Sequence, residues 1–140
     1  MTGGLWFALL AMLLWGAAPL FGKLGLVGIE PLPALAIRSA IVTAVLALAV
    51  TGLGKWPAVF AASAKETAFI GAEGLCAALL GQLAYYYALK LDAVSRVSPV
   101  AAAFPLVSAI LAIILLGEKL TLTKIAGAFF IVTGIILLKM

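Results

Sequence analysis

The residue best suited to chemistry in this sequence is Glu73, a carboxylate inside the apolar run FIGAEGLCAALLGQLAYYYALK at positions 69–90. Two cations, Arg38 and Lys23, also lie within or at the end of apolar stretches. Such groups pair with one another, hold a charged solute or exchange protons. Because removing a charge from water is costly unless the charge is paired, all three are candidate functional residues.

Several other kinds of chemistry lack the residues that they need. The sequence has no histidine and a single cysteine, Cys76, and no cluster of cysteines or carboxylates has metal-ligand spacing. No Ser-His-Asp triad and no glycine-rich phosphate loop is present, so we expect neither an enzyme nor a bound metal or cofactor. The net charge of +4 comes from nine basic residues spread singly along the chain, so no nucleic-acid surface is expected.

The composition indicates a membrane protein. Hydrophobic residues make up 66% of the 140 residues and charged residues 10%, against about 25% charged residues in soluble domains. The mean hydropathy is +1.32. A soluble chain of this length could not hide so much apolar surface, so we expect an all-α, multi-pass protein in the lipid bilayer. The N-terminus lacks the positive start of a signal peptide, which favours a first spanning helix there.

Five apolar segments have the length of membrane spans, since a bilayer core about 30 Å thick needs about 20 helical residues. The helices are expected at about residues 5–22, 32–53, 66–89, 98–116 and 121–138, within a single domain over residues 1–140. Ser98 and Pro99 are expected to begin the fourth helix and Gly117 to end it. An odd number of spans puts the two termini on opposite sides of the membrane.

The basic residues divide almost evenly between the two sides. The N-terminal side would hold Lys55, Lys65, Lys119 and Lys124, and the opposite side Lys23, Arg38, Lys90, Arg96 and Lys139. Because an excess of Lys and Arg on one face orients membrane proteins, this balance favours insertion in both orientations. The alternative is that one or two well-placed charges still decide a single orientation.

A series of motifs runs along the chain in a recognisable order. They are LLWGAAPLFGKLG, RSAIVTAVLAL, the pair Tyr86 and Tyr87 before AL, Pro105 in the fourth segment, LLGEKLT, and a glycine-containing last segment. Together they resemble the EamA repeat of the drug/metabolite transporter superfamily over nearly the whole chain. The chain looks like the single-repeat, five-helix bacterial and archaeal branch, which implies a prokaryotic cytoplasmic membrane.

The same resemblance implies a partner. Most members of the superfamily resemble two fused repeats of opposite orientation, so this chain would form one half of an inverted-repeat transporter. It would then pair with a second copy as an antiparallel homodimer. A heterodimer with a paralogue of fixed, opposite orientation is the alternative.

An inverted second copy would bring two buried charges to the same depth. At 1.5 Å per residue, Glu73 lies about 10 Å below the N-terminal side and Arg38 about 9 Å below the opposite side. Within one chain these depths differ by more than about 10 Å of a core about 30 Å thick. We therefore expect Glu73 to face a polar cavity near Arg38 of the partner subunit. Alternatively, Arg38 and Lys23 reach the headgroups and Glu73 makes a structural hydrogen bond.

Aromatic, proline and small residues complete the expected site. Trp15, Pro19 and Lys23 share one face of the first helix, and Pro19 and Pro105 are candidate hinges. Tyr87 is a cavity residue or an anchor in the interfacial belt. On a regular α-helix the face of Glu73 also carries Ala77, Leu80, Ala84 and Tyr87. The small residues expected to pack against helices are Gly74, Ala78, Gly81, Gly127 and Gly134.

The sequence therefore predicts a secondary transporter that moves a small organic metabolite by alternating access, with Glu73 as the candidate for proton coupling. One alternative is a lipid or lipid-phosphate flippase, in which Arg38 and Lys23 hold a phosphate. Another is an accessory membrane subunit with no transport of its own.

Overall fold

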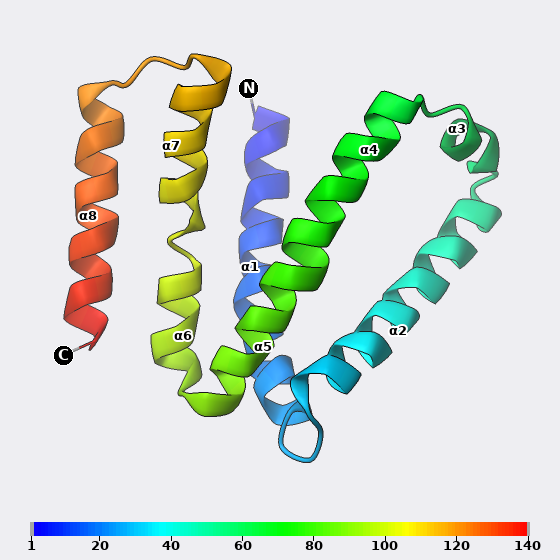
Figure 1. The fold of residues 1–140 in the computed structure, drawn as a ribbon, viewed down its shortest axis with the longest axis horizontal. Coiled ribbons are helices and arrows are strands. Elements are labelled where there is room, and N and C mark those ends of the chain that lie inside the picture. The colour runs from blue at the N-terminus through cyan, green and yellow to red at the C-terminus, as the bar shows by residue number, and fades with distance from the viewer. Residues whose placement is uncertain (1, 140) are drawn as a thin grey trace. The chain divides into compact units, whose positions relative to one another are not determined.

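The computed structural model describes residues 2–139, and this range is helical without any strand. The chain divides into two compact units, Met1–Leu91 and Asp92–Met140. The first unit contains α1 (Thr2–Gly25), α2 (Pro31–Gly52), the short α3 (Trp56–Phe60), and a long helix made of α4 (Ala64–Glu73), the π-helix η1 (Gly74–Gly81) and α5 (Gln82–Leu91). The second unit contains α6 (Val94–Ala101), α7 (Phe104–Leu116) and α8 (Leu122–Lys139) (Figure 1).

The expectation of an all-α membrane protein is confirmed. Within residues 2–139, four helical stretches are long and apolar enough to cross a membrane, namely Gly3–Gly25, Pro31–Gly52, Ala64–Leu91 and Val94–Leu116. A shorter apolar helix covers Leu122–Leu137. At most 6% of each long span is buried inside the protein. The apolar side chains therefore face outward, as they do when lipid is the solvent.

The fourth span begins earlier than the predicted start at Ser98 and Pro99. Its N-cap is Ala93, and Pro99 lies inside α6. The Asp92 carboxylate accepts a hydrogen bond from the Ala93 N–H at 2.6 Å and forms an ion pair with Arg96. The predicted start is therefore incorrect. The Asp92 carboxylate precedes the first turn, where it accepts a hydrogen bond from a free N–H group and is stabilised by the positive end of the helix dipole.

Other helix ends follow from local residue chemistry. The Ser63 hydroxyl accepts a hydrogen bond from the Glu66 N–H, and the Glu66 carboxylate accepts one from the Ser63 N–H, so a capping box begins α4. The end of α7 lies at Gly117, as predicted. Gly117 has a left-handed backbone with φ of 68°, a conformation that glycine adopts without a steric penalty.

The core of the first unit lies where α1 and α2 both pack on α5. Leu26, Leu35 and Leu89 are buried there, with at most 3% of each residue exposed. Gly22 permits the close approach of α1, since a Cβ atom at Gly22 would lie 3.3 Å from Cδ1 of Leu89. We call these four residues the closed end. Away from the closed end, α2 and α4 separate from each other (Figure 1).

Candidate functional site

One face of α1 leads from the closed end to Trp15. Pro19, Gly22 and Leu26 are spaced i, i+3 and i+7, which places them on a single face, and Pro19 and Leu26 are buried. Trp15 precedes Pro19 by four residues and extends the same face, yet 69% of it is exposed. The packing of α1 therefore stops above Pro19, and Trp15 begins an uncovered surface. A role of Trp15 in a cavity stays a prediction.

One face of α2 leads in the same way from the closed end to Arg38. Pro31 and Leu35 are buried, and Arg38 follows them at the i+7 position of the same face. Arg38 is exposed, unlike Pro31 and Leu35 on the same face. The guanidinium thus lies on the uncovered continuation of a packed face.

The facing surface of α5 carries Gln82, Tyr86 and Leu89 at i, i+4 and i+7. Leu89 is buried, and Gln82 and Tyr86 are half-buried. We call these three faces of α1, α2 and α5 the inner surface. Gln82 was missed as a site residue, although it is a neutral polar residue inside an apolar run and that signal was visible in the sequence. Glu73 lies at the end of α4 and is exposed.

Lys23 makes a contact that the sequence did not predict. Its ammonium donates a hydrogen bond to the main-chain carbonyl of Leu89, near the C-terminus of α5. In the opposite direction, Lys90 of α5 donates to the carbonyl of Ile29, between α1 and α2, at 2.9 Å. The last carbonyls of a helix lack intrahelical partners and carry partial negative charge, so an ammonium stabilises them. Lys23 thus ties α1 to α5 at the closed end.

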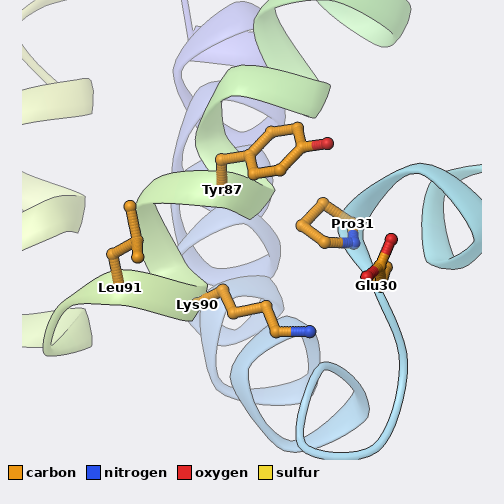
Figure 2. Close-up of a pocket in the computed structure, with 5 residues that line it drawn as sticks. All are labelled: Glu30, Pro31, Tyr87, Lys90 and Leu91. Atoms are coloured by element: carbon orange, nitrogen blue, oxygen red, sulfur yellow. The ribbon is translucent and has the colours of Figure 1, made fainter.

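A crevice of about 380 Å³ lies between the start of α2 and the end of α5. Figure 2 shows Tyr87 reaching across toward Pro31, with Lys90 extending below it toward the chain segment of Glu30. The lining residues are Glu30, Pro31, Tyr87, Lys90 and Leu91. Tyr87 therefore lines this crevice beside α2. Glu30 and Lys90 were missed as site residues, because each reads in the sequence as an ordinary charge at a helix end.

The two candidate hinges differ in their surroundings. Pro19 lies inside the continuous helix α1. Pro105 lies in the first turn of α7, directly after the turn at Ala102 and Ala103 that separates α6 from α7. Proline has no N–H to donate and its ring collides with the preceding helical turn, which explains the interruption. Bending at either residue stays a prediction.

Among the described residues, the small residues expected to pack make no close contact with another helix. A Cβ atom at Gly74, Gly127 or Gly134 would meet nothing within 4 Å, and Ala78 is exposed. At Gly81 a Cβ atom would lie 2.8 Å from the carbonyl oxygen of Cys76, inside its own helix. Contact of these residues with another helix therefore stays a prediction.

The comparisons with known proteins agree with a helical membrane protein. The model of the EamA-like transporter family matches residues 2–140. A protein of Sinorhizobium sp. described as an uncharacterized transporter in the cobO 3' region is 32% identical over 132 residues, which cover 94% of this chain and 93% of the relative. No solved structure matches the chain.

These matches indicate a multi-pass membrane transporter. The chain belongs to the EamA-like transporter family, as its motifs predicted.

Proposed function

We propose that this chain is one half of a secondary transporter that moves small organic metabolites across a prokaryotic cytoplasmic membrane by alternating access. One observation carries the proposal. The inner surface leads from the buried closed end to Trp15 and Arg38, and both of these residues are uncovered. A guanidinium at membrane depth needs water or a partner, so this surface fits the wall of a polar cavity. An antiparallel second copy would supply the opposite wall.

In such a dimer each subunit would place its closed end at a different face of the membrane. Opening one closed end while the other stays packed would give access to the cavity from one side at a time. The closed end is a small cluster held by Lys23 and Leu89, so its opening breaks few contacts. This geometry supports alternating access.

The depths of the two charges support pairing between subunits. Glu73 is nine residues from the start of α4, or about 14 Å, and Arg38 is seven residues from the start of α2, or about 10 Å. After inversion of one copy these depths differ by about 3 Å, which an arginine side chain can span. Within one chain, Glu73 is eighteen residues from the end of α5, which separates it in height from Arg38 by up to about 16 Å.

Coupling to protons follows from this pairing. Glu73 would alternate between an ion pair with Arg38 of the partner subunit and a protonated state, in which the arginine is free to attract solute. The aromatic wall at Trp15 and the scarcity of other charges favour an amphipathic or weakly charged organic solute.

Disulfide cross-linking tests the dimer. In a Cys76→Ala background, one tagged chain carries Glu73→Cys and a differently tagged chain carries Arg38→Cys. We expect a disulfide between the two tags, and none when Leu48→Cys, which lies on α2 at a site that is 73% exposed, replaces Arg38→Cys. A disulfide between two copies of Glu73→Cys, with none to position 38, would show parallel subunits and end the proposal.

Reconstitution tests the transport. Proteoliposomes are supplied with an equimolar mixture of amino acids, amines and short-chain carboxylic acids, and the lumen is analysed by mass spectrometry. We expect at least one component to accumulate, and to do so less with Glu73→Gln. Movement of fluorescent phospholipid between leaflets, without uptake of the mixture, would support the flippase alternative. Absence of both activities, with another protein bound on purification, would support an accessory subunit.

A further inference from the structure

The third span is interrupted by a π-helix of eight residues, Gly74–Gly81, between α4 and α5. π-Helices, which have i→i+5 hydrogen bonds, are rare in proteins. Those that are found lie frequently at functional sites. Here the π-helix separates two polar residues of the span, Glu73 at its beginning and Gln82 at its end. Its register therefore decides which face of the span carries Glu73.

Glu73 and Gln82 are nine residues apart. An α-helix has 3.6 residues per turn, so nine residues make two and a half turns and place the two side chains on opposite faces. With i→i+5 bonds a turn holds about 4.4 residues, so nine residues make about two turns and place them on the same face. Gln82 belongs to the inner surface together with Tyr86 and Leu89. The π-helix therefore turns Glu73 toward the inner surface.

This register corrects the face expected from the sequence. On an unbroken α-helix Glu73 shares a face with Ala84 and Tyr87, and Tyr87 lines the crevice beside α2. The π-helix moves Glu73 by nearly half a turn relative to these residues. The acid and Tyr87 thus belong to different surfaces of the span.

Gly81 permits the π register. A Cβ atom there would lie 2.8 Å from the carbonyl oxygen of Cys76, five residues earlier, and would force the backbone to shift. Return to α-helical bonding relieves this clash, and alanine favours the α-helix over glycine. Gly74 lies in the same π-helix, and a Cβ atom there would meet nothing within 4 Å. Only the glycine at position 81 is thus required by a close approach.

We propose that Gly81 is a positioning residue, which maintains the π register and thereby directs Glu73 to the inner surface above Gln82. This inference rests on the proposed function for the role of Glu73 in transport. The register itself is measured without any transport.

Cysteine reactivity measures the register. In a Cys76→Ala background, Glu73→Cys and Leu75→Cys are compared for reaction with a charged, water-soluble thiosulfonate in proteoliposomes. With Gly81 we expect position 73 to react and position 75 to be protected. With Gly81→Ala we expect position 75 to react and position 73 to be protected. Position 75 is seven residues from Gln82, which is about two α-helical turns and places it on the face of Gln82. Gly74→Ala is the matched control and keeps the original pattern. If Gly81→Ala leaves the reactivities of the cysteines at positions 73 and 75 unchanged, the proposal is overturned.

Relocation of the acid then tests positioning in transport, with the component of the metabolite mixture that the unaltered protein accumulates as the probe. We expect Gly81→Ala to lose as much uptake as Glu73→Gln. The triple variant Gly81→Ala, Glu73→Gln, Leu75→Glu is expected to regain uptake, whereas Glu73→Gln, Leu75→Glu with Gly81 retained does not. If Gly81→Ala had damaged the fold, moving the carboxylate from position 73 to position 75 would not restore uptake.

The two arms separate the failures. An exchange of cysteine reactivity without recovery of uptake in the triple variant overturns the role of Gly81 in positioning a functional acid. If the unaltered protein accumulates nothing, the proposed function fails, and the cysteine pattern by itself decides whether Gly81 directs position 73 to the inner surface.

Discussion

Replacement of Lys23 by methionine is the sharpest test of the closed end. Methionine keeps an apolar stem of similar length, so the change removes the ammonium and retains most of the side-chain packing. The ammonium donates to the Leu89 carbonyl, which joins α1 to a residue 66 positions later in the chain. We expect the variant to lower the free energy of unfolding and to loosen the contact between α1 and α5.

The size of the effect follows from the chemistry of this contact. A hydrogen bond to a charged group contributes about 1.5–3 kcal/mol net when it is shielded from water. Lys23 is half-buried, so solvent screening reduces the expected loss to about 1–2 kcal/mol. A local loss of about 1.4 kcal/mol corresponds to a tenfold change in an opening equilibrium.

Hydrogen exchange followed by mass spectrometry measures this loss where it arises. In reconstituted protein, amides of α5 near Leu89 are expected to exchange about tenfold faster in Lys23→Met, while amides of α8 keep their rates. Lys65→Met is the control, because Lys65 is exposed at the start of α4. Unchanged exchange in α5, or an equal acceleration in the control, would refute the structural role assigned to Lys23.

Three further outcomes are expected from the contacts. Leu89→Ala empties a fully buried site and should cost about 2–3 kcal/mol in an unfolding titration, whereas Leu91→Ala, at a residue 85% exposed, should change the midpoint little. Ser63→Ala removes the cap of α4 and should cost about 1 kcal/mol, seen as faster exchange in the first turn only. Lys124→Met breaks an exposed ion pair of 2.9 Å with Glu118 and should change thermal stability by less than about 1 kcal/mol.

Much of the fold was predictable because span length and hydropathy are local properties. The runs at Leu32–Leu53 and Thr121–Leu138 predicted helices that agree with α2 and α8 to within a residue at each end. The left-handed Gly117 was also predictable, since glycine after a helix is a strong stop signal. The fourth span began too late in the prediction, because the side-chain contacts of Asp92 were not considered.

The candidate site was predictable only in its parts. The cost of a charge in lipid singled out Glu73 and Arg38 without any structure. The partner of Lys23 was not predictable, since the Leu89 carbonyl is a backbone group that any residue would present. Gln82 and Glu30 carried weak signals, and their positions relative to the helices that face them decide their surroundings.

The sequence by itself determined that this chain is a multi-pass EamA-like transporter, because apolar length and ordered motifs are read along the chain. The tertiary structure alone decided where α1 and α2 pack on α5 and where the third span leaves the α-helical register next to Glu73. The physical reason is that lipid solvates every apolar helix face equally well. The pattern of apolar residues therefore does not indicate which face of a helix packs against another helix. The close approach at Gly22 fixes where α1 packs on α5, and the crowded backbone at Gly81 lies within the π-helix of the third span. Both depend on atoms brought together in three dimensions.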